Sequence, residues 1–150
     1  MEKTLILIKP DGVQRSLSGS ILNRLEKSGL KICGLKLIHL DQKQAKEHYA
    51  EHEGKPFFGD LVSYICSAPI IALALSGPNV VEKSRSLIGK TNPLESAPGT
   101  IRGDFGLEIS RNLIHGSATL EDANRELKIF FSKHEIIDYK KSTDSWVMEL

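Results

Sequence analysis

The sequence predicts a layered fold of strands and helices around a central sheet, on a ferredoxin-like (split βαβ) plan. Short apolar runs bounded by turn residues are typical of buried strands, and they alternate with segments of helical apolar spacing. The order strand, helix, strand, helices, strand, helix, loop, strand fits this plan better than a doubly wound one, and no glycine-rich fingerprint follows the first strand. Because no repeat or linker divides the chain, we expect residues 1–150 to form a single domain.

The start of the chain predicts a strand, a helix and a second strand. Residues 4–8 are an apolar run that ends in a Lys-Pro-Asp-Gly turn, so they predict the first strand. Ser18 or Ser20 is expected to cap a helix that Gly29 ends. Residues 30–40 predict the second strand.

The middle of the chain predicts two helices, a strand and another helix. The two helices are expected over residues 42–52 and 56–65, the second opened by a proline. Residues 69–75, bounded by Pro and Gly, predict a buried strand. Asn79 is then expected to cap a helix that ends at Gly89.

The pattern breaks down over residues 90–116, where Pro and Gly recur among polar residues, and residues 107–109 are the candidate extended stretch. A loop this long within a compact domain is usually functional or disordered. Thr119 is expected to cap the last helix, with Asp122 as its partner in a capping box. After Ser132 no period is clear until the tryptophan near the end.

Charge and cysteine usage exclude several classes of protein. A formal net charge of +1 argues against a polybasic nucleic-acid or membrane surface, so an anion site must be a local cluster of basic groups. Cys33 and Cys66 have no metal-ligand spacing and predict small buried side chains in a reducing compartment. The apolar stretch at 5–8 is too short for a signal peptide, and no apolar run approaches the ~20 residues that cross a bilayer. We therefore expect a soluble, cytoplasmic protein without a membrane or specific nucleic-acid partner.

Two short strings resemble well-known motifs but fail in context. The string Ser84 to Thr91 ends in Gly-Lys-Thr like a P-loop, yet it lacks the first glycine and closes a helix instead of following a strand. The string His48 to His52 matches the H-x-x-E-H of a class of zinc protease. A five-residue match is weak and the chain is small for a protease, so we interpret both histidines as solvated or capping groups.

The strongest candidate for chemistry is His115, which lies between an apolar, strand-like entry and Gly116. Ser117 can form a hydrogen bond nearby, and Glu126, in the following helix, can point back at the imidazole. Imidazole is both substantially neutral and nucleophilic near pH 7. Phosphoryl transfer to it would also require fixed cations and hydrogen-bond donors around the phosphoryl group. Candidates for those cations lie at the ends of elements or in the long loop: Lys9, Arg85 and Arg102.

Five sequence strings, in order along the chain, contain several of these residues. They are KPDGVQR at 9–15, KPFF at 55–58, GKTNP at 89–93, PGTIRGDF at 98–105 and RNLIHGS at 111–117. In order and spacing they resemble the nucleoside diphosphate kinases, and the resemblance extends from residue 3 to about residue 139. Five ordered blocks over nearly the whole chain make this resemblance highly specific.

The resemblance implies a fold and a reaction. The fold is α+β, a ferredoxin-like (βαββαβ) four-stranded antiparallel sheet covered by helices. The reaction is a ping-pong transfer of the γ-phosphoryl group from ATP to nucleoside diphosphates through a phosphohistidine, with little base specificity. Homo-oligomers are also implied, with a hexamer favoured over a tetramer or dimer and the loop at 91–112 in subunit contacts.

The resemblance also assigns roles to individual residues. It implies that His115 is phosphorylated, that Glu126 orients it and that Ser117 assists. It places Phe57 and Ile109 on either side of the base. It further implies nucleotide contacts from Lys9, Tyr49, Leu61, Arg85, Thr91, Arg102 and Asn112, with Lys9 also near the transferred phosphate. Magnesium would be held through the nucleotide phosphates, without a direct protein ligand.

Two positions depart from the family pattern. Ala118-Thr119 stands where the family usually has Asp-Ser, and we expect the lost carboxylate to affect stability or subunit packing more than chemistry. Lys55 stands where arginine is common, which keeps the charge but loses the fork. The alternatives are a non-catalytic nucleotide-binding or partner-binding member of the family, and an RNA-binding ferredoxin-like module. Near-neutral charge and 6% aromatic content weigh against the second.

Overall fold

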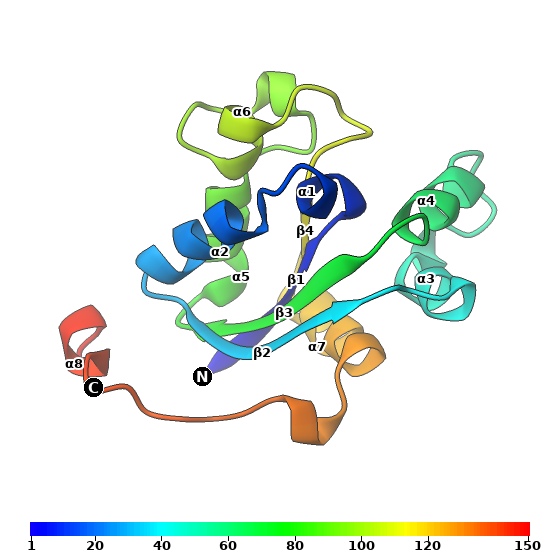
Figure 1. The fold of residues 1–150 in the computed structure, drawn as a ribbon. Coiled ribbons are helices and arrows are strands. Elements are labelled where there is room, and N and C mark those ends of the chain that lie inside the picture. Colours follow the sequence, from blue (N-terminus) through cyan, green and yellow to red (C-terminus); the bar gives the residue numbers. More distant parts are fainter.

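The computed structural model describes residues 1–150 and contains one four-stranded antiparallel sheet (Figure 1). The strands are β1 (Glu2–Ile8), β2 (Lys31–Ile38), β3 (Ile70–Gly77) and β4 (Ile114–Gly116), in the order β2-β3-β1-β4. β1 is therefore central, and it pairs with β4 through three residue pairs, among them Leu7 with His115. The predicted α+β, ferredoxin-like fold is confirmed.

Eight helices connect and cover the strands. They are α1 (Pro10–Gln14), α2 (Ser18–Lys27), α3 (Gln42–His48), α4 (Phe58–Ile65), α5 (Val80–Ile88), α6 (Ile101–Phe105), α7 (Leu120–Phe130) and α8 (Asp144–Val147). Three 3-10 turns add to them at Ala50–His52, Pro93–Glu95 and Lys133–Glu135. Even α7, with 11 residues, is too short to span a bilayer, and no helix here is a candidate membrane span.

Both faces of the sheet are covered by helices, because alternate residues of β1 enter two separate hydrophobic cores. Ile6 and Ile8 pack in one core with residues of α2, α5 and α6. Leu5 and Leu7 pack in the other with residues of α3, α4 and α7. Figure 1 shows α2 and α5 on the opposite side of the sheet from α7. A strand buried on both faces reads as a continuous apolar run, which explains why the strand at 4–8 was predictable.

Several predicted boundaries are wrong in detail. Residues 10–14 form a short helix where a turn was expected, with Pro10 at its first position. Helix α2 begins after Leu17 and has no side-chain cap, so neither predicted serine cap is present. Gly29 follows that helix with φ of +92°, a conformation that favours glycine, and confirms the predicted stop. The expected helix at 42–52 divides at Tyr49 into α3 and a 3-10 turn.

The long loop carries more structure than the sequence suggested. Thr100 accepts a hydrogen bond from the Gly103 amide and caps α6, which was not predicted. Residues 107–109 form no strand and contribute only an isolated bridge between Glu108 and Arg111, while the edge strand is β4. Thr119 caps α7 as predicted, through its side chain and the Asp122 amide at 3.0 Å, without a return bond from the Asp122 carboxylate.

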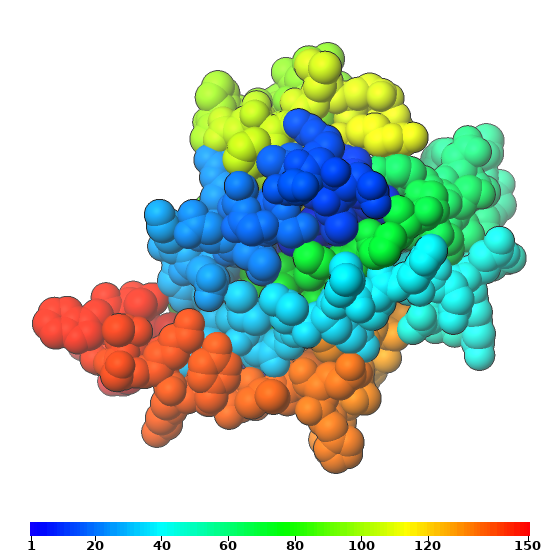
Figure 2. Space-filling model, viewed as in Figure 1, coloured from blue at the N-terminus to red at the C-terminus, as the bar shows by residue number.

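The C-terminal segment lies against the end of α2. Ser132 and Glu135 form a capping box at the start of the last 3-10 turn. The chain then reaches α8, where a Val147 methyl group approaches Gly29 so closely that a Cβ on that glycine would lie only 2.7 Å away. Figure 2 shows the last residues projecting from the body of the molecule beside this region.

Candidate functional site

A cavity of about 260 Å³ lies where β1, β4, α5, α6 and α7 come together. It gathers most of the residues that the sequence marked as candidates. Nine of the predicted site residues line it: Lys9, Tyr49, Leu61, Arg85, Thr91, Arg102, Asn112, His115 and Glu126. The other lining residues are Glu51, His52, Ile88, Gly89, Gly116, Ala118 and Asp122.

His115 is positioned by strand pairing. It stands opposite Leu7 in the register of β1 and β4, so its side chain points to the face of the sheet that α7 covers. Gly116 follows it, and a Cβ there would lie 2.7 Å from the Ile88 methyl group of α5. Glycine therefore lets α5 pack closely against the strand that carries the histidine.

Glu126 holds the imidazole of His115 from α7. Its carboxylate oxygens lie 3.1 and 3.2 Å from Nε2 of His115. Glu126 shares the buried stripe of α7 with Ala123, Leu127 and Phe130, and only 4% of it is exposed. Burial acts to raise the pKa of Glu126, but hydrogen bonds from His115 and Ser117 outweigh it and hold that pKa below its ordinary value.

The ionised carboxylate determines which nitrogen of His115 is free. A carboxylate only accepts hydrogen bonds, so Nε2 of His115 must carry the proton that it donates to Glu126. In the neutral imidazole, Nδ1 then keeps its lone pair. The pair thus presents a nucleophilic nitrogen and a carboxylate that stabilises positive charge on the ring.

Ser117 completes this group from behind the cavity wall. Its hydroxyl donates to Oε2 of Glu126 at 2.7 Å and accepts from the Leu5 amide at 3.3 Å. The serine is buried and is not among the lining residues. It fixes the carboxylate against the central strand, consistent with the predicted assisting position.

Lys9 and Asn112 form a second polar group in the cavity. Nζ of Lys9 donates to Oδ1 of Asn112 at 2.8 Å, and the Asn112 amide donates to the Thr91 carbonyl at 3.0 Å. Burial, and then the charge of Arg102, lower the pKa of Lys9 to about 8, while Asp11 opposes the shift. An anion that entered the cavity would favour the charged form of this lysine.

Arg102 is buried and links two backbone segments through three carbonyls. Its guanidinium donates to the carbonyls of Asn112 at 3.1 Å, Ile114 at 2.6 Å and Gly89 at 3.3 Å. Burial and the neighbouring charge of Arg85 lower its pKa to about 10, so it remains charged at neutral pH. Arg85 donates to the Gly116 carbonyl at 3.3 Å, which places a second guanidinium beside β4.

Strained backbone precedes the histidine. Leu113 has φ of +72°, an unusual value for a residue other than glycine. Its amide donates to Oδ2 of Asp11 at 3.0 Å, and its carbonyl accepts from the Lys9 amide at 2.8 Å. These bonds hold Leu113 in the left-handed conformation, two residues before His115. Neither the strain nor the role of Asp11 was predicted from the sequence.

Two predicted contacts of the base lie outside the cavity lining. The side chains of Phe57 and Ile109 are 46% and 53% exposed. Phe57 lies near His52, with ring centroids 5.4 Å apart, and Nζ of Lys55 is 5.7 Å from the Phe57 ring. Their predicted roles stay predictions.

Ala118, the departure from the family pattern, lines the cavity itself, so the missing carboxylate would have stood in the wall of the site.

His48 is the residue whose environment the sequence analysis misjudged. It is 3% exposed, so it is not solvated, and neither ring nitrogen has a hydrogen-bond partner. Its ring stands edge-on to His115, with centroids 4.6 Å apart. Burial, and then the charges of His115 and Arg125, lower the pKa of His48 well below its ordinary value. The sequence analysis expected one continuous helix over 42–52, which gave no reason to treat His48 and His52 differently. In the structure, the break at Tyr49 separates the two residues.

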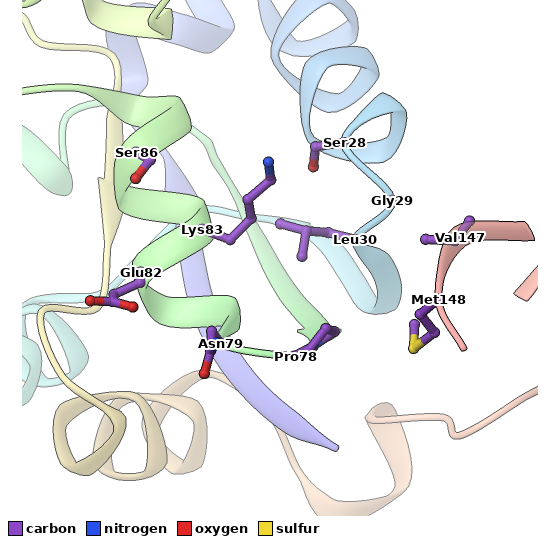
Figure 3. Close-up of a pocket in the computed structure, with 10 residues that line it drawn as sticks. All are labelled: Ser28, Gly29, Leu30, Pro78, Asn79, Glu82, Lys83, Ser86, Val147 and Met148. Atoms are coloured by element: carbon purple, nitrogen blue, oxygen red, sulfur yellow. The ribbon is translucent and has the colours of Figure 1, made fainter. Parts of the chain in front are cut away.

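Among the hollows larger than this cavity, two bear on the choice of site. One, of about 570 Å³, is bounded by the end of α2, by α5 and by α8 (Figure 3). Its charged side chains are only Glu82 and Lys83. The other, of about 640 Å³, adjoins the cavity and shares Arg85, Gly89 and Ala118 with it. Titratable groups with shifted pKa values and mutual contacts favour the smaller cavity as the chemical site.

Comparisons with known proteins agree with the resemblance in the sequence. A family model described as nucleoside diphosphate kinase matches residues 2–136. The chain is 54% identical over 149 residues to a nucleoside diphosphate kinase of Roseiflexus castenholzii, covering 99% of this chain and 100% of that one. It is 48% identical to one of Archaeoglobus fulgidus, covering 99% of each.

Solved structures give the same result. A nucleoside diphosphate kinase family protein of Babesia bovis superposes with a TM-score of 0.97 at 42% identity, over 99% of this chain and 100% of that one. A halophilic nucleoside diphosphate kinase of Halobacterium salinarum, solved in complex with CDP, superposes with a TM-score of 0.95 at 47% identity, over 99% of each chain.

Proposed function

We propose that His115 carries the phosphoryl group in this chain, which belongs to the nucleoside diphosphate kinase family. Its reaction is that of the family, a ping-pong transfer of the γ-phosphoryl group between nucleotides through a phosphohistidine. The observation that supports His115 is the pair it forms with Glu126, because the carboxylate at Nε2 leaves Nδ1 unprotonated in a cavity lined by basic groups. We assign the attack on the γ-phosphorus to Nδ1 of His115.

The surrounding groups suit a phosphorylated imidazole. As Nδ1 takes the phosphoryl group, the ring gains positive charge, which the carboxylate of Glu126 stabilises. Lys9, Arg85 and Arg102 offer fixed positive charge to the phosphoryl oxygens, as phosphoryl transfer requires. In the second half of the cycle, an acceptor diphosphate attacks the phosphohistidine and restores the free imidazole.

Nucleotide binding is assigned to the same cavity. Arg85, Thr91 and Arg102 would hold the phosphate chain, and Lys9 and Asn112 the sugar hydroxyls, with Tyr49 beside the transferred phosphate. Leu61 lies in the lining, and Phe57 and Ile109 would grip the base at its exposed end. An apolar grip reads no hydrogen-bond pattern, so we expect ATP and other nucleoside di- and triphosphates to be accepted alike.

Magnesium would be held by the nucleotide. The cavity lining includes three carboxylates, and that of Glu126 is engaged by His115 and Ser117. Mg²⁺ prefers six oxygen ligands and is commonly bound through substrate phosphates, so this donor set fits an ion brought in on the phosphates. When bound, the ion would neutralise phosphate charge, and the basic side chains would position the chain of phosphates around it.

We expect a homo-oligomer, with a hexamer favoured over a tetramer or dimer. The edge strand β2 has no strand partner on its outer side and carries Leu35 and Leu37, which are 51% and 64% exposed. The loop at 91–112 adds exposed Leu94 and Leu107. Apolar residues on an open sheet edge favour a further contact. The free Cys33 and Cys66 fit a reducing, cytoplasmic location.

Labelling with γ-³²P-ATP tests the proposal. Wild-type protein should acquire label that is lost in acid and kept in alkali, and nucleoside diphosphate should remove it. His115→Ala should acquire none, and a fold check by circular dichroism should match wild type. Label at the wild-type level on His115→Ala would refute His115. Folded wild-type protein that binds ADP but neither labels nor exchanges would instead support the non-catalytic alternative.

A further inference from the structure

His48 is a buried polar side chain that the phosphoryl transfer proposed above does not use. It sits at the end of α3 against the rings of His115, Tyr49 and Phe130. Leaving an imidazole N–H buried without a partner costs free energy, because the group has lost its hydrogen bonds to water. Most buried polar groups have a partner, so the two free nitrogens of His48 call for an unidentified ligand or water.

The nearest groups to His48 form a set of metal donors. One ligand atom each from His48, His115 and Glu126 lie within 4.8 Å of one another. Two imidazole nitrogens, one carboxylate oxygen and an open fourth position are the donor set of catalytic zinc sites. The open position is available here, because His115 and Glu126 both line the cavity.

We infer that His48, His115 and Glu126 form a binding site for a divalent transition-metal ion of the zinc class, and that the ion inhibits the enzyme by occupying His115. The site differs from the one for magnesium, which prefers oxygen ligands and would arrive on the nucleotide. The inhibitory part rests on the proposed function, whereas metal binding does not.

The distance between two of the three donors is close to that of a zinc site. Zinc lies about 2.0–2.2 Å from nitrogen and oxygen ligands, so tetrahedral donors are separated by about 3.3 Å. Nε2 of His115 and Oε2 of Glu126 are already 3.1 Å apart. The His48 donor lies within 4.8 Å of the other two, so its ring would have to move toward the ion on binding. The ion would bind the lone pair of Nε2, and the ring proton would move from Nε2 to Nδ1. Nδ1, the nitrogen assigned to the attack on phosphorus, would then have no free lone pair.

The environment limits which ions bind. Lys9, Arg102 and Arg125 lie close enough to act electrostatically on this part of the cavity. Their charges oppose any cation, and a single carboxylate offsets them only partly. An ion that gains strongly from imidazole ligands is therefore required, which favours zinc, cobalt and copper over magnesium and calcium.

Cobalt provides a direct test, without nucleotide. Metal-free wild-type protein titrated with Co²⁺ should develop the visible absorption of a low-symmetry site at one ion per chain, and Zn²⁺ should abolish it. His48→Phe keeps an aromatic ring but offers no ligand, so it should weaken Co²⁺ binding at least tenfold. His134→Phe, at an exposed position in the last 3-10 turn, is the control and should bind as wild type. No absorption in wild type, or unchanged binding by folded His48→Phe, would overturn the inference; a buried water at His48 would give that first result.

Measurements on wild-type protein avoid dependence on the fold of the variant. In ¹⁵N-histidine spectra, Zn²⁺ should shift the nitrogens of His48 and His115, and the His115 signals should be absent from His115→Ala. Shifts confined to exposed histidines would contradict the site. In nucleotide exchange with excess MgATP, Zn²⁺ should inhibit wild type at a concentration at least tenfold lower than it inhibits His48→Phe, each relative to its own uninhibited rate. Absent exchange with intact Co²⁺ binding would defeat the proposed function and leave the metal site standing.

Discussion

At the scale of single residues, the proposed chemistry depends on which ring nitrogen of His115 carries the proton, and the carboxylate of Glu126 determines this. Glu126 is ionised in a buried position because His115 and Ser117 donate to it. Glu126 of α7 therefore acts on the imidazole, and the imidazole acts on the phosphate. A change in Glu126 should act on catalysis through His115, without removing a contact to the nucleotide.

Glu126→Gln should lower kcat by roughly 10- to 100-fold, as for other groups that orient a histidine from behind. Glutamine keeps the shape but removes the charge that stabilises the phospho-imidazole. Rapid-quench labelling with γ-³²P-ATP measures the phosphorylation step directly. A rate within twofold of wild type would show that the carboxylate does not orient the ring.

Arg102→Ala should lower kcat/KM by an amount worth about 1.5–3 kcal/mol, because a charge-assisted contact to phosphate is lost. The same change should lower thermal stability, because the guanidinium also joins three carbonyls. Steady-state exchange and thermal unfolding measure the two effects. Arg102→Lys keeps the charge but loses the fork and should fall between the two proteins. Unchanged kcat/KM in Arg102→Ala would reject the phosphate contact.

Lys9 predicts a pH dependence. Its pKa of about 8 in the folded protein means that the free enzyme loses this charge as pH rises past 8. We expect kcat/KM to decline above about pH 8, since that ratio reports groups of the free enzyme. Lys9→Met should be slower and lack this basic limb. An unchanged limb in Lys9→Met would assign the titration to another group.

The same lysine has a consequence for folding. Its folded pKa lies below the unfolded value of 10.5, so the unfolded chain binds more protons between about pH 8 and 10.5. The contribution of Lys9 to the free energy of unfolding therefore rises with pH across that window. Activity and the contribution of this residue to stability thus change in opposite directions.

At the scale of elements, caps and close contacts separate what the sequence predicted from what it did not. Long apolar stripes and the Thr119 cap made β1, β2, β3 and α7 predictable. Helix α6 was missed because it has five residues and contains Gly103, which usually argues against a helix. Gly103 leaves no room for a side chain, because a Cβ there would lie 2.1 Å from the Ala97 carbonyl oxygen. Such contacts join residues through space and leave no periodic signal.

The candidate site divides in the same way. The family resemblance implied that Lys9, Arg102 and His115 share one site, and all three line the cavity. The strain at Leu113 and the burial of His48 were not predictable, because both arise from packing between distant segments. The resemblance alone assigned Phe57 and Ile109 to the base, and both are exposed in the structure, so these roles stay predictions.

Thr119→Ala should lower the free energy of unfolding by about 1 kcal/mol, because α7 loses the acceptor for the Asp122 amide. This corresponds to a fall in Tm of about 2–4 °C for a chain of this size. Differential scanning calorimetry measures it, and Thr119→Ser, which keeps the hydroxyl, should retain most of the stability. An equal loss in both variants would indicate that the threonine methyl group, and not the cap, is responsible.

At the scale of the whole molecule, the open edge at β2 predicts assembly. Light scattering should give a mass near six times the 16.6 kDa chain. Leu37→Glu places a charge on the exposed edge and should reduce the mass, whereas Leu94→Glu tests the loop contact separately. A monomer at micromolar wild-type protein would contradict the expected oligomer.

The position of β1 also has a consequence for synthesis. The strand nearest the N-terminus is central, and its partner β4 lies about 110 residues later, as the pair Ile6 and Gly116 shows. A nascent chain on the ribosome therefore holds an unfinished sheet until its last quarter has emerged. The pair proposed for catalysis needs both that edge and α7, so every product of translation that ends before α7 lacks the reactive centre.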